Sequence, residues 1–221
     1  MKKLADGVYH LPGAPGHVIN AYLIGDVLID AAARQSARGL LRQLRGHTVT
    51  AHALTHAHPD HQGASHAICE RLGIPLWCGE ADVPAAQDPA AMKAAMPSTP
   101  PARFFFGIFH GPGHPVARAL REGDDVAGFT VLDVPGHSPG HIAFWRESDR
   151  VLICGDVLTN MGQLSGLPGL HEPSRLLTPD PARNRESAKR LAALEPALVC
   201  FGHGRPLRDP GKLAAFARGL G

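Results

Sequence analysis

Three imidazoles and one carboxylate lie within six residues of this chain, at His56, His58, Asp60 and His61. Neutral imidazoles and carboxylates are the ligands expected for zinc and related transition metals. The group follows an apolar strand, and side chains two residues apart in extended backbone point to the same side, so His56 and His58 can converge on one ion. Pro59 favours this extended backbone at His58. Asp60 and His61 leave in another direction, which suits a second, neighbouring ion.

Three further candidate ligands each lie just past the end of an apolar run, where a rigid sheet can hold them. They are His137, Asp156 and His203. A carboxylate such as Asp156 has two oxygens with which to bridge two ions, and the predicted separation of the ions is roughly 3.5–4 Å. The sequence thus predicts a site for two divalent metal ions, with zinc as the expected metal and manganese or iron as alternatives. Its seven ligands are His56, His58, Asp60, His61, His137, Asp156 and His203.

The elements that position these residues are short β-branched runs that alternate with helical periodicity. We expect strands at 8–11, 20–24, 27–29, 49–54, 74–78, 129–134, 142–145, 151–153 and 198–201. We expect helices at 33–44, 60–72, about 181–194 and beyond residue 210. The pattern occurs in two similar halves, which favours an α/β protein with helices outside two packed sheets.

Residues 84–121 are richer in Ala, Pro, Met and Phe than their surroundings, and we interpret them as a partly helical insertion in a single domain of residues 1–221. The run Phe104-Phe105-Phe106 is either an apolar wall or lid over the metals or the insertion's own small core. His110 and His114 flank a Gly/Pro loop, where they contact either solvent or a substrate.

Other residues that could bind metal have a more favoured structural role. We expect His141 to hydrogen-bond a ligand or the turn rather than coordinate an ion. Asp30, at a strand end, either orients a ligand or caps a turn. The four cysteines are widely spaced without a C-x-x-C pair, and we expect buried free thiols. They are Cys69, Cys78, Cys154 and Cys200.

The composition and charge of the chain indicate which classes of partner to expect. The 221 residues include 22 Lys and Arg against 20 Asp and Glu, giving a formal net charge of +2 with no basic run. We therefore expect a small-molecule substrate and no nucleic-acid partner. Apolar runs are interrupted before the ~20 residues that a membrane-spanning helix needs, so no membrane association is expected. Asp6 and Gly7 come before any apolar stretch, which favours a cytoplasmic protein over an exported one.

The order and approximate separation of four motifs resemble those of the metallo-β-lactamase superfamily over nearly the whole chain. The motifs are His56-x-His58-x-Asp60-His61, Pro135-Gly136-His137, Gly155-Asp156 and Gly202-His203-Gly204. The resemblance implies a four-layer αββα sandwich with the metals at one edge. It also implies how the ligands divide: His56, His58 and His137 on the first ion, Asp60, His61 and His203 on the second, and Asp156 bridging.

Details narrow the choice within that superfamily. Secreted β-lactamases usually have Cys or Ser near the position of Asp156 and carry an export signal, so antibiotic hydrolysis is not expected. The metal set looks like that of glyoxalase II, but only 18 residues follow His203, whereas glutathione recognition in that family lies largely in a C-terminal helical extension. Ribonuclease relatives carry extra modules or basic surfaces that this chain lacks.

The predicted reaction is hydrolysis. A water bridging two ions has its pKa lowered from about 15.7 to about 7, and the resulting hydroxide would attack an ester, thioester or lactone carbonyl while Asp60 orients it. Phosphodiester cleavage uses the same logic. One alternative is a mononuclear iron persulfide dioxygenase with iron on His56, His137 and Asp156. The other is a non-catalytic metal-binding or regulatory domain.

Overall fold

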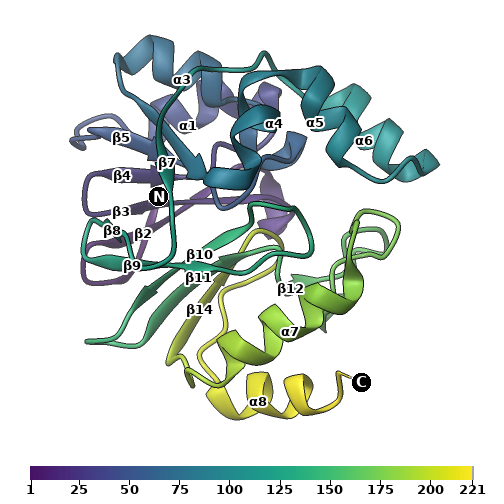
Figure 1. Cartoon of the computed structure of the whole chain (residues 1–221). Helices are drawn as coiled ribbons and strands as arrows, with labels where there is room; N and C mark the ends of the chain where they lie inside the picture. Colours follow the sequence, from purple (N-terminus) through teal and green to yellow (C-terminus); the bar gives the residue numbers. More distant parts are fainter. Residues whose placement is uncertain (221) are drawn as a thin grey trace.

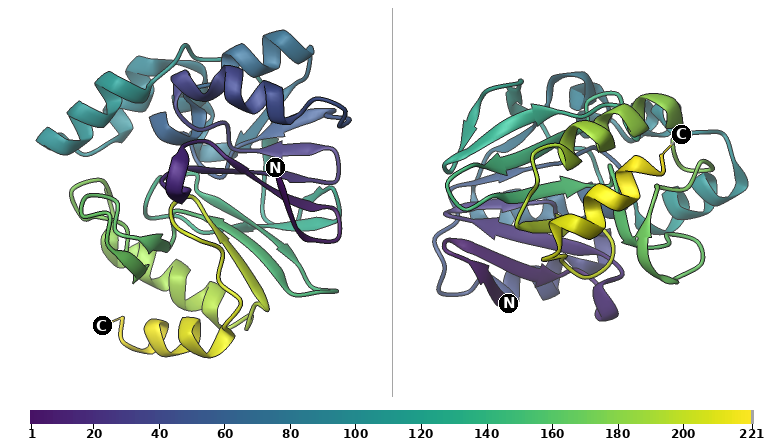
Figure 2. Two further views of the ribbon diagram at one scale, coloured as in Figure 1. Left: turned by 180° about the vertical axis from the view of Figure 1, so that it is seen from behind. Right: turned by 90° about the horizontal axis from the view of Figure 1, so that it is seen from below.

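Two β-sheets face each other, and helices cover both outer sides (Figure 1). The computed structural model describes residues 1–220. Its four layers are the expected αββα sandwich. The two further views in Figure 2 show that the helices of the first half and those of the second half lie on opposite sides of the sheet pair.

The first sheet has seven strands in sequence order, antiparallel from β1 to β4 and parallel from β4 to β7. Its strands are β1 (Lys2–Ala5), β2 (Val8–Pro12), β3 (Asn20–Ile24), β4 (Val27–Ile29), β5 (Ala51–Ala53), β6 (Leu76–Gly79) and β7 (Val116–Leu120). The helices on its outer side are α1 (Ala37–Gln43), α2 (Pro59–Gln62), α3 (Ser65–Leu72), α4 (Val83–Gln87), α5 (Pro89–Ala95) and α6 (Pro100–Phe109).

The second sheet has the strand order β14-β11-β10-β9-β8, and only the β11–β14 pair is parallel. Its strands are β8 (Asp125–Val126), β9 (Phe129–Asp133), β10 (Ile142–Arg146), β11 (Val151–Gly155) and β14 (Leu198–Phe201). Two helices cover it, α7 (Pro181–Ala192) and α8 (Pro210–Arg218). A small ribbon, β12 (Thr159–Met161) with β13 (Pro168–His171), follows β11.

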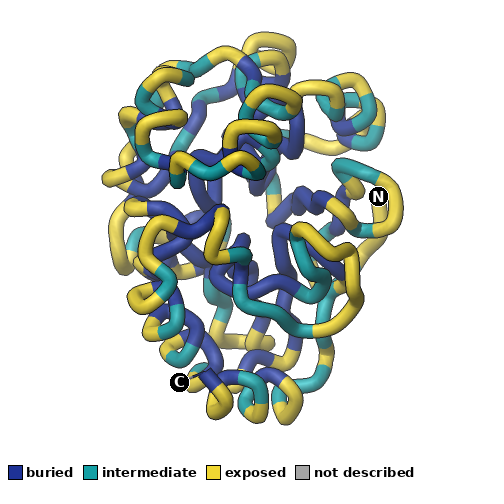
Figure 3. The backbone as a smooth tube through the Cα atoms, turned by 90° about the vertical axis from the view of Figure 1, so that its right-hand side faces the viewer, coloured by how far each residue is buried: buried dark blue, intermediate teal, exposed yellow. Residues whose placement is uncertain are grey.

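The central strands are buried on both faces, which explains why they are continuous apolar runs rather than alternating ones. Tyr22 and Ile24 of β3 point between the sheets, where they join a cluster with Phe144 of β10. Leu23 points the other way and packs with Leu40 of α1. Figure 3 shows the result, with buried backbone concentrated in the sheets and exposed backbone on the outer helices and loops.

Four helices begin with the same local signal, a capping side chain followed by proline at the first helical position. The side chain accepts a hydrogen bond from a backbone N–H of the first turn in each case. The capping residues are Asp88, Thr99, Asp180 and Asp209. These local signals define where α5 to α8 begin.

The structure confirms the expected strands with small shifts of their ends, and it differs from the expected helix at 60–72. That segment is two helices, α2 and α3, separated at Gly63. A side chain at Gly63 would meet the carbonyl oxygen of Phe109 at 2.3 Å and the backbone nitrogen of Arg34 at 2.5 Å, so the chain passes here through a space that only glycine fits.

The end of the expected insertion has a regular place in the fold. Val116–Leu120, within the range 84–121, is strand β7, which extends the first sheet in parallel beside β6. Residues before it form α4, α5 and α6. The four cysteines are buried and unpaired, as expected. Within residues 1–220, no helix has the length and apolar character needed to cross a membrane.

His52, in β5, gives a prediction about acid stability. Its side chain is fully buried, with Nδ1 3.0 Å from the carbonyl oxygen of Leu28 and Nε2 2.7 Å from Oγ of Ser65. Burial lowers its pKa from 6.5 to about 4. Because the unfolded chain binds this proton more readily, His52 contributes stability above pH 6.5 that is lost as the pH falls toward 4.

We expect acidification from about pH 7.5 to about pH 4.5 to cost wild type about 2–3 kcal/mol more than it costs His52→Gln, which cannot be protonated there. Urea unfolding at the two pH values measures this. The other histidines are common to both proteins and cancel. Equal losses in the two proteins would show that His52 takes up no proton on unfolding.

Candidate metal centre

Three histidines form the first group of candidate ligands. His56 and His58 follow β5, and His137 follows β9. One nitrogen from each lies within 4.8 Å of the others, and Nδ1 of His58 is 3.0 Å from Nε2 of His137. All three side chains are buried. The strand-end positions that the sequence indicated therefore do bring these imidazoles together.

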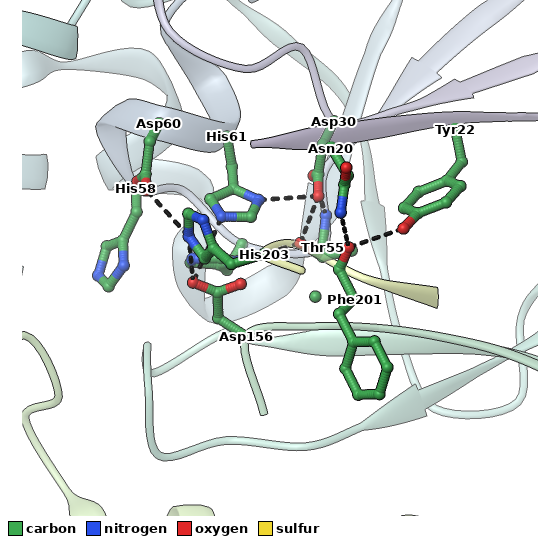
Figure 4. A network of polar contacts seen from close by, with 12 residues as sticks. Asn20, Tyr22, Asp30, Thr55, His58, Asp60, His61, Asp156, Phe201 and His203 are labelled. Atoms are coloured by element: carbon green, nitrogen blue, oxygen red, sulfur yellow. Dashed lines mark hydrogen bonds and ion pairs between the residues drawn. The ribbon is translucent and has the colours of Figure 1, made fainter. Parts of the chain in front are cut away.

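The second group joins both halves of the chain (Figure 4). Asp60 and His61 lie in α2, Asp156 follows β11 and His203 follows β14. Their donor atoms also lie within 4.8 Å of one another. Nε2 of His203 is 3.2 Å from Oδ2 of Asp60 and 3.0 Å from Oδ2 of Asp156. The structure thus brings all seven predicted residues into two adjacent groups.

Asp156 connects the two groups. Its Oδ2 is 3.5 Å from Nε2 of His61 in the second group and 3.6 Å from Nε2 of His137 in the first. A carboxylate in this position can contact ions in both groups, which is the placement expected of a bridging ligand.

Several donor atoms of the two groups find no hydrogen-bonding partner in each other, although metal ions could bind them. Nε2 of His56, Nε2 of His61 and Oδ1 of Asp156 are buried and have no hydrogen-bond partner among residues 1–220. A buried polar atom left unpaired costs about 1–3 kcal/mol. Two divalent cations would satisfy these atoms, and nitrogen and carboxylate oxygen are donors that such ions accept.

The electrostatics separate the two groups. Burial, together with neighbouring imidazoles, holds the pKa of His56 and of His137 well below the ordinary value, so both are neutral and able to bind metal. Burial opposes protonation of His203 too, but Asp156 and Asp60 outweigh it and raise its pKa to about 10. Asp156 and Asp30 likewise raise the pKa of His61 well above its ordinary value against burial. In the metal-free protein these protons neutralise the carboxylates.

Asp30 holds one candidate ligand in place. Its Oδ2 lies 2.9 Å from Nδ1 of His61, and its two oxygens accept bonds of 2.8 Å from the backbone N–H and the hydroxyl of Thr55. Thr55 Oγ1 is in turn 3.0 Å from Nδ1 of His56. Of the two roles expected for Asp30, contact with a candidate ligand is the one found. A bond at Nδ1 leaves Nε2 of each imidazole directed to the centre.

Asp82 is a buried residue that the sequence analysis missed. Its carboxylate accepts from the backbone N–H of Ala57 at 2.9 Å, the hydroxyl of Ser138 at 2.7 Å and the N–H of Gly140 at 2.7 Å. Asp82 is therefore hydrogen-bonded both to the loop that carries His56 and His58 and to the loop that carries His137. The signal was present, since Asp82 closely follows the apolar run of β6, as the candidate ligands follow theirs.

His141 lies beside the centre and outside both groups. Its ring centroid is 4.5 Å from that of His56, and the backbone N–H of Asp156 points to its Nε2 at 3.4 Å. Burial lowers its pKa to about 3, so it is neutral. This agrees with the expected supporting role. Gly202 shows how tight the packing is here, because a Cβ on it would lie 2.1 Å from Oδ1 of Asp156.

The end of β14 is fixed to the first sheet. The Asn20 side-chain amide donates to the carbonyl oxygens of Phe201 at 3.0 Å and Gly204 at 2.8 Å, and the Tyr22 hydroxyl donates to Phe201 at 2.7 Å (Figure 4). These bonds come from β3, far away in the sequence. They set the position of His203 relative to the residues that follow β5.

A cavity that is open to solvent leads to the centre. Its polar lining includes one or more members of each ligand group. The polar residues are His58, Asp60, His137, Gln163 and His203, and the larger apolar ones are Val18, Ile19, Met96, Phe105, Phe109, Met161 and Leu177. Gln163 also donates to Oδ2 of Asp156 at 2.7 Å.

The insertion supplies one wall of this cavity. Phe105 and Phe109 of α6 line it, and both also pack against the outer core of the first sheet. Phe105 therefore has both roles considered for the Phe104–Phe106 run, since it forms part of the cavity wall and part of a hydrophobic core. Phe104 is 62% exposed. Neither His110 nor His114 is among the lining residues, so the substrate contact considered for them has no support.

The family model of the metallo-beta-lactamase superfamily matches residues 14–203. This chain belongs to that superfamily. The resemblance seen in the motifs is confirmed, and the match spans every candidate ligand from His56 to His203.

Two relatives illustrate the range of the superfamily. The chain is 31% identical to the probable metallo-hydrolase YflN of Bacillus subtilis (strain 168) over 200 residues, which cover 82% of this chain and 76% of the relative. It is 40% identical to a hydroxyacylglutathione hydrolase of Fuscovulum blasticum over 94 residues, covering 40% of this chain and 33% of that enzyme.

Solved structures agree with the fold. BLEG-1, a B3 metallo-β-lactamase, superposes with a TM-score of 0.75 and 26% identity, covering 96% of this chain and 99% of its own. TTHA1623, solved in a di-iron-bound form, gives a TM-score of 0.66 and 33% identity over 93% of this chain and 94% of its own. Metal-dependent hydrolases thus occur among the relatives.

Asp30 provides a test of the second group. Asp30→Asn keeps a residue type that tolerates the left-handed backbone at this position, where φ is 58°, but places an amide where two oxygens now accept three bonds. We expect metal affinity to fall by about 10–100-fold, because His61 loses its orienting partner.

Competition with a chelator of known affinity measures this change. Asp26→Asn is the matched control, since Asp26 lies in the turn at the other end of β4, and among the described residues its side chain bonds only the exposed Thr50. It should bind metal as wild type does. Unchanged affinity in Asp30→Asn would remove Asp30 from the metal centre.

Proposed function

We propose that the chain is a binuclear metallo-hydrolase, with zinc as its metal, that cleaves an ester, thioester or lactone bond. The observation that carries the proposal is the position of Asp156 Oδ2 between two groups of buried ligands that open into one cavity. His56, His58 and His137 would hold one ion, and Asp60, His61 and His203 the other. Bound there, two ions would supply a hydroxide at neutral pH and polarise a carbonyl.

Asp60 is the residue that we propose to orient the attacking water. It lines the cavity, and its side chain is 21% exposed, against 1% for Asp156. Burial opposes its ionisation, but the hydrogen bond from His203 outweighs this and holds its pKa below the ordinary range. Asp60 is therefore a carboxylate at neutral pH, and a carboxylate accepts a hydrogen bond from water.

The cavity lining favours a substrate with an apolar group next to the scissile carbonyl. Polar atoms gather on the side of the candidate ligands, and Phe105, Phe109 and Leu177 supply apolar surface facing the same space. The hydroxyacylglutathione hydrolases among the relatives support a thioester, and the B3 enzymes make a β-lactam a necessary comparison. The arrangement requires no serine or cysteine nucleophile.

Elemental analysis followed by an activity panel tests the proposal. We expect about two zinc ions per chain, and loss of activity after chelation that two equivalents of zinc restore. The panel comprises aryl esters, acyl thioesters, lactones, a phosphodiester and a β-lactam. His137→Ala should lose metal and activity together. A content of one iron per chain, with oxygen uptake on a persulfide, would contradict the proposal. So would a His137→Ala protein that binds no metal but keeps its full effect in the cell.

Phe105 tests the apolar wall. Phe105→Ala should raise KM about tenfold or more for esters with a six-carbon acyl group and much less for acetyl esters, because each buried methylene contributes about 0.8 kcal/mol. Phe104→Ala is the control, since the Phe104 side chain, next to Phe105 in the sequence, is exposed and does not line the cavity. Equal changes for long and short acyl groups would place the acyl group elsewhere.

A further inference from the structure

A second cluster of metal-binding side chains lies outside the centre described above. His66 and Glu70 are four residues apart in α3 and therefore on one face of the helix. His114 comes from the segment between α6 and β7. One donor atom from each lies within 4.8 Å of the others. None of the three residues lines the cavity.

The distances within this cluster suit a metal ion. Nδ1 of His66 is 3.2 Å from Nδ1 of His114, and the rings are inclined by 64°. Two nitrogens bound to one tetrahedral zinc ion at about 2.0–2.1 Å are separated by roughly 3.3 Å. Oε1 of Glu70 is 3.9 Å from Nδ1 of His114. The Glu70 side chain is 65% exposed, so it can rotate to close the remaining gap.

The backbone holds His114 in this position independently of its side chain. The N–H of His114 donates to the carbonyl oxygen of Ala86 in α4 at 3.1 Å. The neighbouring Gly113 lies so close to Gln87 that a Cβ on it would be 2.0 Å from the Gln87 carbonyl oxygen. The backbone of His114 is therefore held in place beside α4, with its imidazole next to that of His66 in α3, which favours a preformed metal site.

We propose that His66, Glu70 and His114 bind a third divalent transition-metal ion, preferably zinc. This site is separate from the paired centre, which is the two adjacent groups of candidate ligands described above. Two imidazoles and one carboxylate leave one position for water. The ion would link α3 to the segment that follows α6. Since α6 carries Phe105 and Phe109, the site would restrain the wall of the substrate cavity from outside.

Equilibrium dialysis against buffered free zinc tests the site. We expect His66→Gln/His114→Gln to bind one zinc ion fewer per chain than wild type, with the zinc content of the two ligand groups of the candidate metal centre unchanged. His47→Gln is the control, because His47 is exposed and belongs to no cluster of metal-binding side chains among the described residues. Equal zinc content in the double variant and wild type would overturn the proposal.

A measurement on wild type covers the case in which the double variant folds poorly. Crystals soaked in zinc should give an anomalous difference peak between His66 and His114, in addition to any peaks at the paired centre. A map with peaks at the paired centre and none between these two imidazoles would overturn the proposal. Glu70→Gln should weaken the peak between them without affecting the others.

Discussion

Two carboxylates and five imidazoles crowd together where the ends of two sheets meet, nearly all of them shielded from water. Removing a charged group from water costs several kcal/mol unless it is paired. The surrounding structure reflects that requirement. Protons on His61 and His203 balance the charges of Asp60 and Asp156 in the metal-free protein. Asp30 and Asp82 lie just behind the candidate ligands, and all their carboxylate oxygens accept hydrogen bonds. Divalent ions would provide the same compensation more completely.

The same region joins the two sheets. Hydrophobic packing between them is non-directional and leaves their relative position free to slide. Directional bonds from Asn20 and Tyr22 to the end of β14 remove that freedom. Asp82 does the same for the loops after β5 and β9. The candidate metal centre and the packing of the two sheets therefore share one set of buried polar contacts, and a change in any of them acts on both.

The sequence pattern predicted helices outside two packed sheets, and the resemblance of its motifs to the superfamily implied the αββα sandwich that the structure shows. The seven candidate ligands could be named because their motifs follow the ends of apolar runs, and the structure brings these residues together. What the sequence did not reveal depends on partners far away in the chain. Asp82 follows an apolar run, but its role depends on donors from two other loops that the sequence does not place beside it, and the break at Gly63 depends on its approach to Phe109. Strand β7 has a weak pattern of alternating exposure, and its place comes from pairing with β6.

The order of the ligands along the chain matters during synthesis. The three imidazoles of the first group have all been made once residue 137 is in place, whereas the second group still lacks Asp156 and His203 at that stage. A nascent chain that ends before residue 201 also lacks the β14 terminus, which Asn20 and Tyr22 bind. The second group of candidate ligands is therefore completed later in synthesis than the first, together with the strand end that joins the two sheets.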